Sequence, residues 1–303
     1  MTSVLYDVPG PRAERRNRIL GVVTIVVVLA LLGVIVWRFA VTGQFSAEKW
    51  QAFSYTAIWL KFAEATGATL AAFAGAGVGA VLLGFLLAIA RLSDHAWVRV
   101  PATALIEVLR AVPVLVFMML LYYGLPGIGI KMDPYWAVVI ALVLYNGSVL
   151  AEILRAGIES LPRGQGEAAY AIGLRKSGVM RLVLLPQAVR AMMPVIIAQL
   201  VVTLKDTALG FVITYPELLY FAKILGSNPR LGSPLLQSAA VAGTIYIAMC
   251  LALSYAAFRV EKRLSSGPGE ATAAAPTAAT VVAHDGTDTE LIAAQKGPRD
   301  KKK

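Results

Sequence analysis

Long runs of mainly apolar residues are the dominant pattern along this chain. A helix that crosses the hydrocarbon core of a membrane needs about 20 such residues. Six segments reach that length, at about residues 20–41, 67–90, 103–123, 135–156, 191–213 and 235–258. The pattern therefore predicts an all-α integral membrane protein with six transmembrane helices.

The first apolar segment fits either a cleaved signal peptide or a retained helix. Basic residues precede it, which suits both interpretations: Arg12, Arg15, Arg16 and Arg18. Its apolar core, residues 19–36, is longer than the usual signal core of about 7–15 residues, and no small-x-small cleavage pattern follows directly. We therefore expect a retained helix.

Composition supports a membrane protein and argues against nucleic-acid binding. Hydrophobic residues make up 58% of the chain and charged residues 15%, against about 45–50% and 25% in soluble proteins. The net charge of +10 comes from scattered basic residues without a nucleic-acid recognition motif. Such an excess is typical of cytoplasmic loops. The single cysteine, Cys250, allows no internal disulfide and leaves the redox compartment open.

The positions of Lys and Arg predict the orientation of the helices. With the N-terminus inside, the longest inner loop and its flanks are rich in basic residues: Arg155, Arg163, Arg175, Lys176, Arg181 and Arg190. The outer segments carry fewer: Lys49, Lys61, Lys131, Lys223 and Arg230. Because basic residues concentrate on the cytoplasmic side, we expect both termini in the cytoplasm.

Two outer segments have a mixed pattern that does not predict a span. Residues 47–62 combine aromatic and charged side chains, and residues 216–225 predict a short helix that begins at Pro216. Aromatic residues favour the membrane interface, so interfacial anchoring and contact with an external partner both fit.

The loop at residues 157–189 predicts two short helices. Residues 167–172 are strong helix formers, with Glu167 at the N-terminal end where the helix dipole favours an acid. Gly173 is placed to end this helix.

A second short helix is expected directly afterwards. Ser177 is placed to cap a turn that runs to Leu185. Pro186 is then expected to mark the turn back into the membrane.

These residues carry a resemblance to a known family. The run Glu167-Ala168-Ala169, followed by Gly173 and then by Val183-Leu184-Leu185-Pro186, resembles the EAA loop of bacterial ABC importer permeases. The family has Ile where this chain has Val183. The residues on either side, 161–165 and 187–188, fit the same pattern.

Three further stretches resemble the polar amino-acid branch of that family. Residues 204–209 and 151–155 fit, and residues 109–113 are similar to an Arg-Gly-Thr-Pro stretch, from which Ala111 and Val112 depart. The resemblance covers roughly residues 66–260.

The resemblance implies an ABC type I importer permease core in a bacterial inner membrane. Residues 1–65 would hold the cytoplasmic N-terminus, the first helix and an outer amphipathic segment. Residues 66–260 would form the permease domain, and residues 261–303, poor in apolar side chains, a disordered cytoplasmic tail.

The resemblance also implies partners. The EAA loop would dock on a separate ATP-binding subunit through Glu167, Ala168, Ala169, Gly173 and Pro186. A second permease chain, the same or related, and an extracytoplasmic solute-binding protein would complete an importer that works by alternating access. The chain has no Gly-x-x-x-x-Gly-Lys-Ser/Thr phosphate loop, so ATP hydrolysis is expected on the separate subunit. We expect this chain not to be an enzyme, and to hold no cofactor or metal. The branch points to polar amino acids, with glutamate or glutamine preferred.

Polar residues within the fourth and fifth segments are candidates for the substrate path. Buried polar groups are costly in lipid and usually face a cavity or a partner. The candidates are Asn146, Thr203, Lys205, Asp206 and Thr207. Lys205 and Asp206 together suit a zwitterionic amino acid, and the pattern around Asp206-Thr207 predicts a broken helix. Contacts that only join helices within the bundle fit these residues equally well.

Other pairs have more than one interpretation. Glu107 with Arg110, and Glu152 with Arg155, have the spacing of same-face ion pairs. Gly75 and Gly79 permit close helix approach, either within the chain or between two chains.

Two other classes of function remain as alternatives. A gradient-driven secondary amino-acid transporter needs no ATPase-docking loop, and a membrane scaffold or sensor subunit leaves the charges of the fifth segment without a purpose.

Overall fold

The computed structural model describes residues 10–265, and every element in that range is helical. The α-helices are α1 Pro11–Val41, α2 Ala47–Gln51, α3 Thr56–Arg91, α4 Ala96–Ala111, α5 Val114–Met119, α6 Pro134–Glu159, α7 Arg163–Ala171, α8 Lys176–Gly178, α9 Leu185–Asp206, α10 Leu218–Gly226 and α11 Leu235–Ser265. Short 3₁₀ segments are Ala52–Ser54, Leu125–Ile128, Thr207–Ile213 and Pro229–Leu231. Two π-helical turns are Leu120–Gly124 and Val179–Leu184.

Within residues 10–265, five helical segments are long and apolar enough to cross a membrane, and a sixth counts if the bent pair Ala96–Ala111 and Val114–Ile128 is one span. Residues 1–261 form one unit and residues 262–303 another. Helix α11 runs on to Ser265, and the rest of the expected tail lies outside the described residues.

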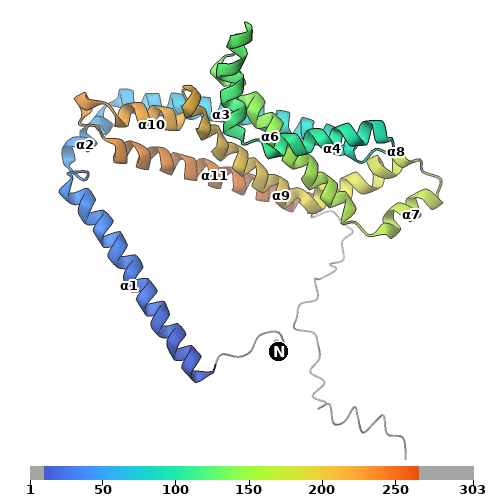
Figure 1. Ribbon diagram of the computed structural model, residues 1–303, viewed down its shortest axis with the longest axis horizontal. Coiled ribbons are helices and arrows are strands. Elements are labelled where there is room, and N and C mark those ends of the chain that lie inside the picture. Colours follow the sequence, from blue (N-terminus) through green and yellow to red (C-terminus); the bar gives the residue numbers. More distant parts are fainter. Residues whose placement is uncertain (1–9, 266–303) are drawn as a thin grey trace, which may run out of the picture. The chain divides into compact units, whose positions relative to one another are not determined.

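The third expected span, residues 103–123, is not one straight helix. Helix α4 and the segment Val114–Ile128 meet at an angle of 93°. The bend falls at Val112, whose backbone is extended (φ −89°, ψ 125°) and which precedes Pro113. The residue before a proline is disfavoured in the helical conformation, so the helix ends there. Figure 1 shows the following segment, in green, leaving the neighbouring helices.

The expected turn at Pro186 is also wrong. Helix α8, the π-helical turn Val179–Leu184 and α9 follow one another without a gap, so Pro186 lies inside a continuous helical path. Ser177 lies within α8 and does not cap it, because the N-cap position belongs to Arg175.

Both π-helical turns end two residues before a proline, Pro126 and Pro186. A proline ring clashes with the carbonyl four residues earlier in a regular α-helix. In a π-helical turn each hydrogen bond spans five residues instead of four. This shift relieves the clash, which explains why the path stays helical through Pro186.

The centre of the fold is the packing of α3 against α6. Alanines along α3 (Ala72 and Ala76) are fully buried against Ala141 and Leu142 of α6. A Cβ atom at Gly79 would lie 2.4 Å from Val143 Cγ2, and one at Gly75 would lie 3.0 Å from the Tyr135 hydroxyl. The two glycines therefore serve packing within the chain.

Helix α3 is longer than expected. It begins at Thr56, within the segment expected to be amphipathic, and has 36 residues, which corresponds to about 54 Å. At its N-terminal end Phe62 and Ala65 pack with Leu218 and Ala222 of α10. We call this the α10 end of the bundle, and the opposite end, near Arg91, the α7 end.

Helix α10 begins at Leu218, two residues later than expected, because Glu217 caps it. The Glu217 carboxylate is fully buried and accepts hydrogen bonds from the Leu219 and Tyr220 amides at 2.8 and 2.6 Å. The Tyr246 hydroxyl of α11 donates to the same carboxylate at 2.8 Å. Burial raises the pKa of Glu217 to about 7, against the lowering effect of these hydrogen bonds.

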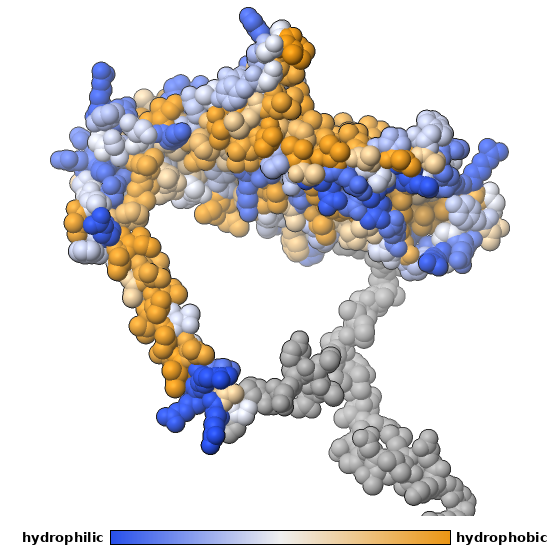
Figure 2. Space-filling view, viewed as in Figure 1, coloured by the Kyte–Doolittle hydropathy of each residue, from blue (hydrophilic) through white to orange (hydrophobic). Residues whose placement is uncertain are grey.

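Helix α1 exposes apolar side chains on all of its sides. Residues from Ile19 to Val41 are largely exposed, and none of the apolar window of this helix is buried. Figure 2 shows α1 mainly in orange, with blue at its N-terminal end. A helix that is hydrophobic all round is typical of a membrane span.

Candidate functional site

The first part of the candidate site is helix α7 in the loop expected at residues 157–189. Glu167 and Ala168 are exposed on it, whereas Ala169 is buried. Beyond the helix, Ile172 is 79% exposed although its side chain is apolar. An exposed polar helix with an adjoining apolar side chain is suited to contact with another protein.

The end of α7 is a Schellman motif, as the sequence predicts. Gly173 has a φ of +85°, a conformation that glycine adopts without strain. Its amide donates to the Tyr170 carbonyl at 2.9 Å, and the Leu174 amide donates to the Ala169 carbonyl at 3.2 Å, which is the bonding pattern of this motif. A Cβ atom at Gly173 would meet nothing within 4 Å. The glycine is therefore required by the backbone conformation and not by crowding within the chain.

Helix α7 is attached to the start of α9. The Gln187 side chain of α9 donates to the Gln165 side chain of α7 at 3.3 Å. Near the end of α6, Gly157 also lies so close to α9 that a Cβ atom there would come within 2.4 Å of Met192 Cγ. Pro186 lies exposed beside these contacts.

Charged side chains cluster at the α7 end of the bundle. Arg91 of α3 forms an ion pair with Glu152 of α6 at 2.7 Å, and Glu152 also accepts from Arg155. The expected pairing of Glu152 with Arg155 is therefore confirmed. Lys176 pairs with Asp94, and this hydrogen bond is the main reason that the pKa of Asp94 lies below its usual value.

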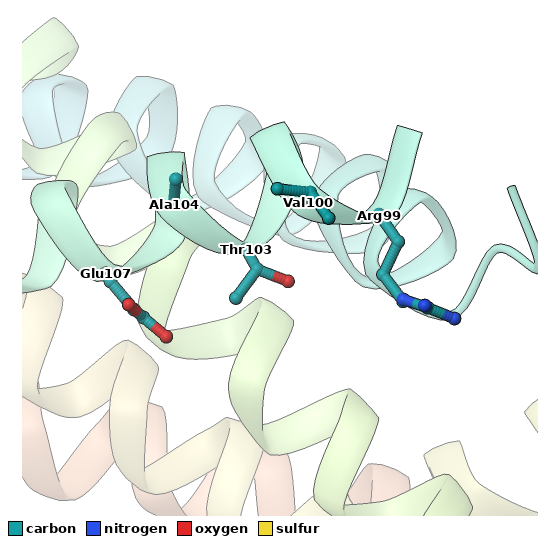
Figure 3. A pocket seen from close by; sticks show the side chains of 5 residues that line it. All are labelled: Arg99, Val100, Thr103, Ala104 and Glu107. Atoms are coloured by element: carbon teal, nitrogen blue, oxygen red, sulfur yellow. The ribbon is translucent and has the colours of Figure 1, made fainter. Parts of the chain in front are cut away.

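The other expected pair, Glu107 with Arg110, does not form an ion pair in the part of α4 that the structure describes. Glu107 instead borders an open depression of about 390 Å³ with Arg99, Val100, Thr103 and Ala104. Figure 3 shows Arg99, Thr103 and Glu107 leaving α4 on the same side, as their spacing of four residues requires.

The second part of the candidate site is the polar group on α6 and α9. Asn146, Thr203 and Thr207 are fully buried. Thr203 and Thr207 donate to the carbonyls of residues 199 and 204 on their own helical path. The Asn146 side chain accepts from the Gln199 side chain at 2.7 Å, which joins α6 to α9. Within this chain these three residues stabilise the bundle.

Lys205 and Asp206 lie differently from these three residues. Lys205 is exposed and Asp206 half-buried, and neither side chain forms a hydrogen bond or ion pair within the described residues. Lys205 borders an open depression of about 370 Å³ with Ala208, Tyr246, Ile247 and Cys250. The α-helix ends at Asp206 and continues directly as a 3₁₀ helix from Thr207. The expected broken helix is therefore not seen, because Lys176–Ile213 forms one candidate span in which only the hydrogen bonding changes.

The bond between Asn146 and Gln199 gives a testable prediction for bundle packing. Replacing both residues with Leu should show a coupling energy of about 1 kcal/mol in a double-mutant cycle, because interhelical hydrogen bonds in membranes are worth about 0.6–1.7 kcal/mol. Unfolding of the four proteins in detergent measures it. Additive effects of the two single changes would contradict the contact.

Two residues with the interhelical contacts described above, Glu217 and Lys176, were not identified from the sequence patterns. Glu217 follows Pro216 and precedes an apolar run, which is the position of a helix cap, although Glu is not a usual cap. Lys176 was counted only as part of the basic loop. Within the described residues, no group of three or more His, Cys, Asp or Glu side chains is placed to hold a metal ion.

The fold and the site define a multi-pass helical membrane protein with an exposed helix between two bundle helices. Residues 80–266 match the family model of binding-protein-dependent transport system inner membrane components. The chain belongs to this family and is a permease subunit of an ABC importer.

Similar proteins of known role agree with this family. The chain is 37% identical over 229 residues to the glutamate transport system permease protein GluD of Corynebacterium glutamicum, covering 74% of this chain and 83% of that protein. It is 32% identical to the glutamine transport system permease protein GlnP of Escherichia coli, covering 61% of this chain and 84% of GlnP. A crystal structure of an amino acid ABC transporter with histidines matches with 32% identity and a TM-score of 0.62, over 70% of this chain and 97% of the other.

Proposed function

We propose that this permease imports polar amino acids, with glutamate or glutamine preferred, and that a separate ATPase docks on α7 to drive it. The observation that carries the proposal is the exposed α7, closed by Gly173 in the left-handed conformation. The similar proteins GluD and GlnP are permeases of glutamate and glutamine transport systems, which supports polar amino acids as the class of substrate.

The docking segment would comprise the coupling residues expected from the sequence, of which Ala169 is buried beneath the surface: Glu167, Ala168, Ala169, Gly173 and Pro186. The Glu167 carboxylate is free to pair with a basic side chain of the ATPase. The small Ala168 allows close approach of the ATPase backbone, and Ala169 packs α7 onto its own chain.

The substrate path would run beside Lys205 and Asp206. Lys205 would bind the carboxylate of an amino acid and Asp206 its ammonium group, because neither side chain is paired within the described residues. Asn146, Thr203 and Thr207 would border the path and hold its walls. A second permease chain, the same or related, would close the depression beside Lys205.

The orientation follows from the charge distribution. The α7 end would face the cytoplasm of a bacterium, with both termini on that side, because Arg91, Arg155 and Lys176 lie there. A solute-binding protein would then approach the α10 end. Residues 66–260 would form the permease domain, preceded by the N-terminal segment 1–65.

Co-purification with the ATPase from the same operon tests the docking surface. We expect the unaltered chain to retain the ATPase, and Glu167→Ala combined with Gly173→Asp to retain at least about tenfold less, which corresponds to about 1.4 kcal/mol of binding. A Cβ at Gly173 meets nothing within this chain, but the φ of +85° strains any residue other than glycine, so the loss would report on the end of α7 as well as on the partner.

Gly129→Asp is the matched control. Gly129 has a φ of +84° and equally empty surroundings, but it lies in the loop before α6. This variant should retain the ATPase fully. Equal retention by the coupling variant and the control would contradict docking of the ATPase through this surface.

A further inference from the structure

The C-terminal end of α3 is attached to the polypeptide on both sides of α7. Before α7, Arg91 pairs with Glu152 at 2.7 Å, and Glu152 also accepts from Arg155 Nε at 3.0 Å. The three side chains are only 18–25% exposed. Partial burial makes this pairing stronger than a fully exposed ion pair.

After α7, the attachment is made by Lys176. Its ammonium group donates to the Leu92 carbonyl at 3.1 Å and also to the Asp94 carboxylate. Leu92 is the C-cap residue of α3. A cation at that position is stabilised by the unpaired carbonyls and the dipole of the helix. Lys176 thus ties the chain that follows α7 to the end of α3.

Helix α3 reaches from these two attachments to α10. It packs on α6 along the centre of the bundle. At the α10 end, the Thr69 hydroxyl of α3 accepts from the Leu218 amide at 3.2 Å, and the Tyr215 hydroxyl donates to the Ala68 carbonyl at 2.7 Å. One continuous helix therefore contacts both the coupling segment and α10.

We propose that α3 carries the displacement of α7 to the α10 end, and that Lys176 and Glu152 are the positioning residues that attach it. This inference rests on the proposed docking of an ATPase on α7. Docking moves α7, and α3 follows because it is held before and after that helix. The packing of α3 on α10 then transmits the movement to the opposite end.

The test uses the permease complex with its ATPase, reconstituted with the amino-acid-loaded binding protein. Lys176→Met removes the cation and keeps the length of the side chain. We expect this variant to retain the ATPase and its basal hydrolysis, with stimulation by the loaded binding protein reduced about fivefold, the lower range of measured coupling between sites. Lys176→Arg should restore most of the stimulation, because a guanidinium also donates to the Leu92 carbonyl.

One further variant is a control for folding, and another tests the same contact from its other side. Glu64→Gln removes the exposed ion pair with Lys61 within α3 itself and should leave stimulation unchanged. Asp94 is an exposed loop residue outside any helix, and Asp94→Asn weakens its contact with Lys176. This variant should reduce stimulation, as Lys176→Met does.

The outcomes separate the two proposals. If the unaltered chain does not retain the ATPase, the proposed function fails and this inference fails with it. If the unaltered chain is stimulated and Lys176→Met and Asp94→Asn match Glu64→Gln, only the role of α3 is overturned. Loss of ATPase retention in Lys176→Met would also overturn it, because Lys176 would then belong to the docking surface.

Discussion

Gly84→Leu should prevent this permease from folding. Gly84 of α3 faces α6 so closely that a Cβ atom would lie 2.8 Å from Leu150 Cβ and 3.1 Å from the Gly147 carbonyl oxygen. The contact is mutual, because a Cβ at Gly147 would lie 3.0 Å from Leu83 Cδ2. Neither backbone is able to withdraw without disturbing the whole α3–α6 contact.

The expected cost of Gly84→Leu exceeds the usual 1–3 kcal/mol of an overpacked core, because the clash involves backbone atoms on the facing helix. Leucine is apolar and favours helices, so insertion of α3 into the membrane stays favourable. We expect little folded protein after detergent extraction, measured by size-exclusion chromatography and thermal unfolding.

Gly67→Leu is the matched control for this change. Gly67 lies in the same helix, is exposed, and has nothing within 4 Å of a Cβ atom. This variant should fold at least as well as the unaltered chain, because glycine within a helix costs about 1 kcal/mol. Equal yields of the two variants would contradict the close approach of α3 and α6.

Glu217→Ala should lower the thermal stability at every pH. The change removes the acceptor of three buried donors: the Leu219 and Tyr220 amides and the Tyr246 hydroxyl. Each buried donor left without a partner costs about 1–3 kcal/mol. Unfolding in detergent measures the loss, and Glu48→Ala, at an exposed site on α2, should show none.

Glu217→Gln should change how stability depends on pH. Burial raises the pKa of Glu217 from 4.5 to about 7 in the folded protein, so the folded state holds a proton that the unfolded chain releases. This contribution to stability is complete below about pH 4.5 and is lost as the pH rises through about 7. The full shift corresponds to about 3 kcal/mol.

The glutamine variant lacks this titration. The unfolding temperature of the variant minus that of the unaltered chain should therefore increase from pH 5 to pH 8. A constant difference over that range would show that Glu217 titrates as an ordinary exposed carboxyl.

The apolar pattern predicted most of the bundle because the membrane imposes length and composition on each span. Gly173 was also predictable, since a glycine after a strong helix former is a local signal. The bend at Val112 carried a signal as well, in the form of Pro113, but the apolar run continued through it. Hydropathy does not distinguish a straight span from a bent one.

Other features depend on contacts between distant residues. The beginning of α3 at Thr56 is fixed by packing of Phe62 on α10, and no local pattern shows that. Two donors to Glu217 are local amides of α10, but the third, the Tyr246 hydroxyl, reaches it only after α10 and α11 meet. The sequence placed Asn146, Thr203 and Lys205 in one set, whereas the fold turns the first two inward and leaves Lys205 exposed.

The π-helical turn Val179–Leu184 has a geometric consequence for α9. A π turn contains one more residue than the α-helical turn it replaces, and each residue of an α-helix advances the direction of the side chains by about 100°. The extra residue therefore sets the angular phase of everything after it. It decides that Thr203 faces the interior while Lys205 faces outward, some twenty residues further along the chain.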